Sequence, residues 1–432
     1  MNFLYIHTHD TGRCISPYGC NVRTPNYQRV ARKAAVFRQA FCAAPTCSPS
    51  RAALLTGQYP HAAGMLGLAH RGFALADPTQ HLAHFLGRSG YDTVLCGVQH
   101  EANNPQDIGY TQTITQGDDM SNAQAAAAFL QNHDGQRPFF LSFGMFATHR
   151  EFPDSAAQRD ANYLSPAPTM ADTPATRKDW ADFLGSVEHA DSCLGVVMEA
   201  LETAGLAQDT LVLVTTDHGP AFPRMKCHLQ DAGIGVLMML RGPGVPAGVI
   251  DAMVSHIDIF PTVCELMGLE KPDYLQGTSM RPLFAGAAGI HKELYAEVTY
   301  HAAYEPQRCI RTKRYKYISY YDDDDHDRYV LANIDDSPSK DFLMKHGLYD
   351  GPRTRYQLYD LYNDPQERDN LYGNPAYARI QESLQARLRA HMHATNDPLL
   401  IAFKGRVPLP AGATANTRDC ISPQSKNPVD YE

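Results

Sequence analysis

The sequence lacks the features that mark membrane proteins, exported proteins and small disulfide-stapled folds. It contains no run of eighteen apolar residues, so no segment is expected to span a membrane. The first residues show no basic stretch followed by a long apolar one, which predicts no secretory signal and a cytoplasmic location. The ten cysteines are scattered without CxxC spacing, and we expect most of them to be reduced and buried.

The sequence also has no excess of positively charged residues. The chain has 38 Lys and Arg against 47 Asp and Glu, and its net charge of −9 argues against nucleic-acid binding but leaves a local basic pocket open. With 432 residues, 44% hydrophobic and 20% charged, the composition is typical of a globular protein of two or three domains. The sequence leaves open whether the protein forms a homo-oligomer. The 19 histidines are the one unusual feature of this composition.

Short apolar runs alternate with segments of helical periodicity. This alternation is typical of an α/β sandwich, and each run is predicted to be a buried strand of a mostly parallel sheet. Apolar residues at helical spacing between 183 and 201 predict a core helix that stops at Gly205. The predicted strands cover residues 3–6, 93–96, 139–143, 211–215 and 236–240.

The pattern changes after about residue 290. Tyr-rich segments such as 314–318 are typical of antiparallel strands in a smaller second unit. We therefore expect a catalytic domain over residues 1–295, a small C-terminal α+β subdomain over 296–400, and an irregular Pro-containing tail over 401–432.

Asp and His residues follow four of the predicted strands. Because ligands bind beyond the carboxyl ends of parallel strands, we expect these side chains to meet at one edge of the sheet. Asp and His are ligands of divalent cations, although each pair taken alone is also compatible with ordinary turn chemistry. The residues concerned are His9 and Asp10, then His100, then His149, and finally Asp217 and His218.

Residues 47–57 predict a short helix with a cysteine at its positive end. Ser48 is the expected N-cap, Pro49 the first helical residue and Gly57 the stop. An anion would be favoured at this end, beside the guanidinium of Arg51.

The thiol of Cys47 has two simple interpretations. It is either a nucleophile with a lowered pKa or a buried structural residue. Phosphatases that use a thiolate have Arg six residues after the Cys, and here that position is Ala53, which counts against a thiolate phosphatase.

The motif at 47–51, followed by Leu-Leu-Thr-Gly at 54–57, resembles the signature of the formylglycine-dependent sulfatases of the alkaline-phosphatase superfamily. Further segments that resemble landmarks of this family follow in the family's order, at 217–219, 255–262, 276–279 and 358–371. The resemblance implies an alkaline-phosphatase-like α/β/α sandwich with a small C-terminal antiparallel sheet domain.

The resemblance also implies a nucleophile and a metal. Cys47 would be oxidised to formylglycine by a maturation enzyme, and one hydroxyl of its hydrate would attack sulfur while the other drives elimination of sulfate. Asp10, Asp217, His218 and residue 47 match the family's ligands to a divalent metal, and Arg51 would stabilise the diol.

Three further residues match family positions that handle protons and sulfate. His100 matches the base for the elimination step, and His149 and Lys226 match the pair that binds sulfate and protonates the leaving group. On the residues alone, a hydrogen-bonded loop histidine and an exposed lysine stay open for the last two.

Two positions depart from the family pattern. His9 stands where the family has a first Asp, which replaces an oxygen ligand by a nitrogen ligand. Because Ca²⁺ prefers oxygen ligands, this departure counts against it; Ca²⁺ is still the metal that we expect first, and Mg²⁺, Mn²⁺ and Zn²⁺ stay open. Val98 stands where the family often has Lys, so one cation that contacts sulfate is missing.

The N-terminal part is most similar to sulfatases that act on glucosamine units of heparan-type glycans, including N-sulfoglucosamine sulfohydrolases. We therefore expect a sulfate ester or a sulfamate on a sugar as substrate. His301, Glu305 and Arg308 in the second unit are predicted to read sugar hydroxyls or a carboxylate, and ordinary structural roles are the alternative.

Two other functions remain open from the sequence. A formylglycine- and metal-dependent phosphonate monoester or phosphodiester hydrolase of the same superfamily is the main alternative. A binding protein without catalytic activity is the other, because His9 and Val98 depart from the pattern.

Overall fold

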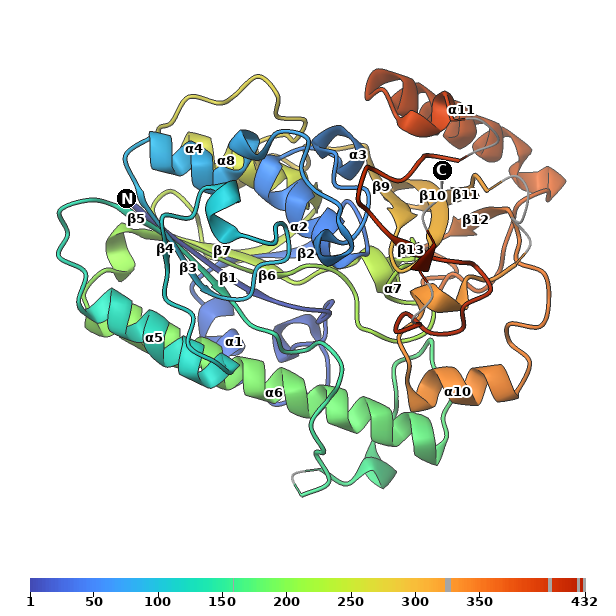
Figure 1. Cartoon of the computed structure of the whole chain (residues 1–432), viewed down its shortest axis with the longest axis horizontal. Helices are drawn as coiled ribbons and strands as arrows, with labels where there is room; N and C mark the ends of the chain where they lie inside the picture. Colours follow the sequence, from blue (N-terminus) through green and yellow to red (C-terminus); the bar gives the residue numbers. More distant parts are fainter. Residues whose placement is uncertain (158, 323–327, 403–405, 426–427, 430–432) are drawn as a thin grey trace.

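A large sheet between two layers of helices and a smaller sheet beside it make up the molecule (Figure 1). The computed structural model describes the whole chain except residues 158, 323–327, 403–405, 426–427 and 430–432. Among the described residues, no helix is both long and apolar enough to cross a membrane.

The large sheet has eight strands in the order β4-β3-β5-β1-β6-β7-β2-β8. All neighbouring pairs are parallel except the two that β7 makes, so the predicted mostly parallel sheet is confirmed. The strands are β1 Asn2–Thr8, β2 Ala35–Phe41, β3 Asp92–Gly97, β4 Gln112–Thr113, β5 Phe139–Gly144, β6 Thr210–Thr216, β7 Met238–Arg241 and β8 Gly248–Ser255.

The direction predicted for the strand at 236–240 was wrong. This segment forms β7, which runs antiparallel to both β6 and β2. A parallel connection usually needs a crossover helix, and between β6 and β7 the chain has only the four-residue α7 Asp231–Ile234. The apolar pattern predicts a buried strand but carries no information on its direction.

Alternating residues of the central strands feed two separate cores. In β1, Phe3 and Tyr5 pack on one face and Leu4 and Ile6 on the other. The first face is covered by α2 Cys47–Thr56, α4 Leu82–Arg88 and α8 Ile259–Met267, and the second by α1 Pro25–Ala31, α5 Asp119–Gln131 and α6 Pro174–Thr203 (Figure 1).

The core helix predicted between 183 and 201 lies within α6 and is confirmed. Thr173 caps this helix in a capping box with Thr176, and Pro174 occupies its first turn.

The small sheet has the order β12-β11-β10-β9 and is antiparallel throughout, as predicted. The Tyr-rich segment 314–318 lies largely in β11. Strand β9 begins before the domain boundary that we expect at residue 295. The remaining strands and α-helices of the described residues are β9 Glu293–Tyr300, β10 Tyr304–Thr312, β11 Tyr315–Tyr320, β12 Tyr356–Asp360, β13 Ala415–Asn416, β14 Pro428–Val429, α3 Pro60–Ala63, α9 Arg281–Phe284, α10 Pro338–Lys345 and α11 Ala378–Ala394.

Candidate active site

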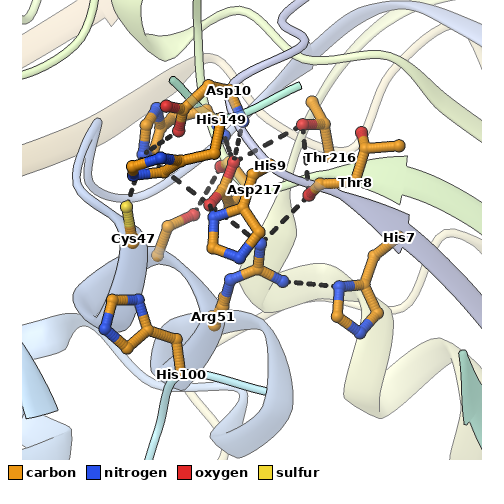
Figure 2. Close-up of polar contacts among 12 residues, drawn as sticks. His7, Thr8, His9, Asp10, Cys47, Arg51, His100, His149, Thr216 and Asp217 are labelled. Atoms are coloured by element: carbon orange, nitrogen blue, oxygen red, sulfur yellow. Dashed lines mark hydrogen bonds and ion pairs between the residues drawn. The ribbon is translucent and has the colours of Figure 1, made fainter. Parts of the chain in front are cut away.

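The carboxyl ends of the central strands bring the predicted residues together. His9 and Asp10 follow β1, His149 follows β5, and Asp217 follows β6. Figure 2 shows these side chains converging on Cys47 at the start of α2. The ring centroid of His9 lies 5.6 Å from that of His149 and 6.1 Å from that of His100. The expected convergence at one edge of the sheet is therefore present in the structure.

The helix that carries Cys47 begins earlier than predicted. Thr46 is its N-cap and Cys47 its first residue, and Gly57 ends it with a φ of 66°. Pro49 fits inside the first turn because backbone N–H groups there have no partner within the helix. Ser48 was wrongly predicted as the N-cap, because its hydroxyl instead accepts a hydrogen bond from the backbone of Ala69 at 3.0 Å.

Burial makes an unmodified thiolate at position 47 unfavourable. The side chain of Cys47 is buried, and this burial raises the pKa of its thiol despite the nearby cation of Lys226. A protonated thiol is a weak nucleophile. The structure therefore gives no support to thiolate chemistry at Cys47.

A group of buried atoms in the site fits a metal ion. His9, Asp10, Cys47 and Asp217 each offer one ligand atom, and these atoms lie within 4.8 Å of one another. Nε2 of His9 is buried without a hydrogen-bond partner, and Nδ1 of His9 and Oδ1 of Asp10 are buried with one contact of 3.3 Å each, to Asp217 and to His218. Buried polar atoms without partners are costly, so a bound cation would satisfy groups that the protein itself leaves open.

His218 lies beside this group with one nitrogen available. Its Nδ1 lies 2.9 Å from the carbonyl oxygen of Gly219, to which it can donate, so its Nε2 keeps a lone pair. That Nε2 lies 3.4 Å from the sulfur of Cys47 and 3.3 Å from Oδ1 of Asp10. With its proton on Nδ1, His218 would present an unprotonated Nε2 to a metal.

The backbone of Asp10 is held in an unusual conformation. Its φ is 50°, a left-handed value that few residues other than glycine adopt. The N–H of Asp10 donates to Oδ1 of Asp217 at 2.8 Å, which links the ends of β1 and β6. Strained backbone of this kind is concentrated at functional sites.

Arg51 ties the helix to the two strand ends. Its guanidinium donates to Oδ2 of Asp217 at 3.0 Å, to the carbonyl oxygen of Thr8 at 3.0 Å and to Nδ1 of His7 at 2.5 Å. Its Nε is buried without a partner. Arg51 therefore positions Asp217 and places a fixed positive charge beside Cys47.

Lys226 is buried rather than exposed. Its ammonium lies 3.0 Å from Oδ2 of Asp10 and 3.0 Å from Oδ2 of Asp335. Burial alone would lower the pKa of Lys226, but Asp10 and Asp335 raise it well above its usual value. The residue is a permanent cation in the site.

His100 and His149 each have one ring nitrogen held by a neighbouring group. Burial, together with the neighbouring His70, lowers the pKa of His100 to about 3. Nε2 of His100 lies 2.8 Å from Nδ1 of His70, and Nδ1 of His100 is buried without a partner. His149 is anchored by its Nδ1, which lies 2.5 Å from the carbonyl oxygen of Arg150. Each ring therefore keeps one nitrogen for another partner.

The three residues predicted to bind substrate lie in different surroundings. Nδ1 of His301 is buried without a hydrogen-bond partner, and its charged neighbours include Lys226 and Asp335 of the site. The side-chain oxygens of Glu305 are instead occupied, by Arg353 at 2.6 Å and Asn333 at 3.1 Å.

Arg308 uses all five of its N–H groups inside the protein. They donate to both oxygens of Asp397, to the carbonyl oxygens of Val298 and Gln307, and to the hydroxyl of Thr299. Arg308 and Glu305 thus have no free groups for a sugar, and the structure favours the structural alternative for both.

Three residues of the site were not predicted from the sequence. His7 and His70 belong to the histidines that remained unassigned, and each contacts a predicted residue. Asp335 lies more than a hundred residues from Lys226 in the sequence, and no motif marked it. The histidine excess was a usable signal for the first two, whereas Asp335 offered none.

The net charge of the site would be balanced by one divalent cation and one singly charged anion. Arg51 and Lys226 contribute two positive charges, and Asp10, Asp217 and Asp335 contribute three negative ones. A divalent ion would convert this deficit into one excess positive charge, which a singly charged ester would neutralise.

Comparison with known proteins identifies the family of this chain. Residues 2–269, more than half of the chain, match the sulfatase family. The chain belongs to the sulfatase family. It is therefore a sulfuric ester hydrolase by family. In addition, residues 225–352 of this sulfatase match the family described as N-sulphoglucosamine sulphohydrolase, C-terminal.

Individual relatives agree with this assignment. Human N-sulphoglucosamine sulphohydrolase is 28% identical, and the match covers 89% of this chain and 88% of that protein. A structure solved with its substrate D-glucosamine-2-N,6-O-disulfate has a TM-score of 0.70 at 18% identity, covering 92% of this chain and 98% of the other. The phosphonate monoester hydrolase of Silicibacter pomeroyi also has a TM-score of 0.70 at 18% identity, with 91% and 95% covered. At these identities the two structures establish a shared fold alone.

Proposed function

We propose that this sulfatase hydrolyses a sulfate ester or a sulfamate on a sugar, with heparan-type glucosamine units as the favoured substrate. The observation that carries the proposal is the placement of Cys47 beside His218 and within the group formed by His9, Asp10 and Asp217. The match of residues 225–352 to the N-sulphoglucosamine sulphohydrolase C-terminal family supports the choice of sugar.

Residue 47 and its neighbours would hold one divalent metal. Cys47 oxidised to formylglycine by a maturation enzyme, together with the metal, would supply a hydrated aldehyde oxygen as nucleophile and a Lewis acid for the sulfate. The ligands would come from His9, Asp10, Asp217, His218 and residue 47. Ca²⁺ is favoured by the carboxylates, and Mg²⁺, Mn²⁺ or Zn²⁺ would also accept the nitrogens of His9 and His218.

The remaining residues would handle charge and protons. Arg51 stabilises negative charge on residue 47 from a fixed position, because its guanidinium is held by Asp217. His100, neutral and with one free nitrogen, accepts the proton in the elimination step. His149 and Lys226 bind the sulfate and protonate the leaving group.

Parallel assays on enzyme produced together with a maturation enzyme test this proposal. Glucosamine N-sulfate, glucosamine 6-O-sulfate, an aryl sulfate and an aryl phosphonate monoester are compared by kcat/KM, with Cys47→Ala as the matched blank. We expect a sulfated glucosamine to be the best substrate and the variant to be inactive. Dominant turnover of the phosphonate would instead assign the chain to the phosphonate hydrolases.

A further inference from the structure

Two side chains from the C-terminal part of the chain reach the sulfate-binding end of the site. His301 follows β9, and Asp335 lies between residue 333 and the first turn of α10. The carboxylate of Asp335 pairs with the ammonium of Lys226 at 3.0 Å, and the rings of His301 and His149 are among the groups that interact with it. Asp335 therefore stands next to the residues that would hold the leaving group.

Asp335 and His301 keep hydrogen-bonding capacity that the described residues do not use. Oδ2 of Asp335 is buried and has only the ion pair with Lys226, and its Oδ1 has no hydrogen-bond partner among these residues. The His301 ring likewise has no partner there, and its Nδ1 is buried. Buried polar atoms of this kind are costly unless a ligand satisfies them.

The backbone on both sides of Asp335 is fixed. The side chain of Asn333 accepts from the backbone of Ala303 at 2.8 Å, and the hydroxyl of Ser337 accepts from the N–H of Lys340 at 3.1 Å. The ammonium of Lys340 donates to the carbonyl oxygen of Ile334 at 2.7 Å. The carboxylate of Asp335 is thus preorganised on a braced loop.

We propose that Asp335, with His301 beside it, is a specificity-determining residue that reads the sugar position next to the sulfated one. Its carboxylate accepts a hydrogen bond from a hydroxyl or an N–H at that position and repels a second sulfate there. The preferred substrates are therefore sugars that carry one sulfate and have a free hydroxyl or N–H at the neighbouring position. This inference rests on the proposed function, because it takes Lys226 to be the residue at the leaving group.

The charges of the site support this selectivity. With a divalent ion bound, one singly charged sulfate ester neutralises the pocket, and a second sulfate would bring excess negative charge close to Asp335. A carboxylate cannot donate a hydrogen bond to such a sulfate.

Asp335→Asn tests the proposal, with Asp336→Asn as the matched control. The control removes the same charge from the adjacent residue, whose carboxylate pairs with Lys340 and not with Lys226. One substrate pair is two aryl sulfates that differ only in a hydroxyl next to the ester. The other pair is glucosamine N-sulfate and its 3-O-sulfated derivative. Values of kcat/KM are measured for the wild type and both variants.

We expect the wild type and Asp336→Asn to prefer the hydroxyl-bearing and singly sulfated members. In Asp335→Asn each preference should fall by about ten- to a hundredfold, the value of one hydrogen bond to a charged group. Asp335→Ser should give the same shift, which covers the case in which the Asn variant does not fold.

Unchanged ratios in the Asp335 variants would overturn the proposal. This includes an equal loss on every substrate, which would mean that Asp335 only holds Lys226. If the wild type hydrolyses aryl phosphonates and no sulfate, the proposed function fails, and a phosphonate pair with and without the neighbouring hydroxyl then decides the role of Asp335 separately.

Discussion

Replacing Arg308 by Met should destabilise the protein and leave substrate binding unchanged. The five N–H groups of Arg308 are all used, with the shortest contact at 2.5 Å to Asp397, and Glu297 lies 3.9 Å away. The variant leaves the buried Asp397 without its cation, while Glu297 keeps its pair with His61. Loss of one partner of a buried pair costs about 3–5 kcal/mol.

This loss is large enough to see in a thermal melt. For a chain of 432 residues it corresponds to a fall in Tm of about 3–6 °C. Arg137→Met is the control, because the side chains of Arg137 and of its partner Asp92 are 56% and 44% exposed. An exposed pair contributes about 0–1 kcal/mol, so the control should shift Tm by about 1 °C at most.

The kinetics of the same variant complete the test. Well below Tm, Arg308→Met should keep the KM of the wild type for a sulfated glucosamine. A tenfold rise in KM with an unchanged Tm would refute the structural assignment and restore Arg308 as a substrate-binding residue.

Three further outcomes are expected. Burial lowers the pKa of His61, but the carboxylate of Glu297 at 2.5 Å has the larger effect, and the net pKa is raised. The pair therefore stabilises the fold fully below about pH 6.5, and this stabilisation is lost as the pH rises through the pKa of His61 in the folded protein. In urea unfolding, the stability that His61→Gln loses should therefore be greater near pH 6 than near pH 9; an equal loss at both would disprove the linkage. A chelator should abolish activity, and His9→Asp should shift its restoration toward Ca²⁺ relative to Zn²⁺, whereas an unchanged metal order would argue against His9 as a ligand. His100→Ala should lower kcat by about 10²- to 10⁴-fold with the fold intact, and near-normal turnover would remove His100 from the proton-transfer step.

Residues whose role follows from local sequence were the ones that could be predicted. The strand ends that carry His9, Asp10 and Asp217 stand out because apolar runs precede them, and parallel topology then brings them together. Helix α2 was recognised from its motif, but its predicted start was wrong, because the hydroxyl of Ser48 accepts a hydrogen bond from Ala69 instead of capping the helix. Apolar periodicity likewise gave β7 as a strand but could not give its direction.

Contacts between distant segments were the part that could not be predicted. Arg308 and Glu305 lie in β10, and the sequence does not reveal that they pair with Asp397 and Arg353 in the folded chain. Asp335 reaches Lys226 only because α10, which follows it, is held against α6, where the hydroxyl of Ser339 donates to Asp179. Such ion pairs depend on tertiary packing, which local patterns do not encode.

The chemical state of residue 47 in active enzyme decides whether this residue is the nucleophile. Mass spectrometry of the peptide that contains residue 47 is combined with sulfate release from a sulfated glucosamine, for enzyme produced with and without a maturation enzyme. We expect an aldehyde at residue 47 and a specific activity that rises in proportion to the aldehyde fraction. Full activity in a preparation that contains only the Cys47 thiol would contradict this expectation.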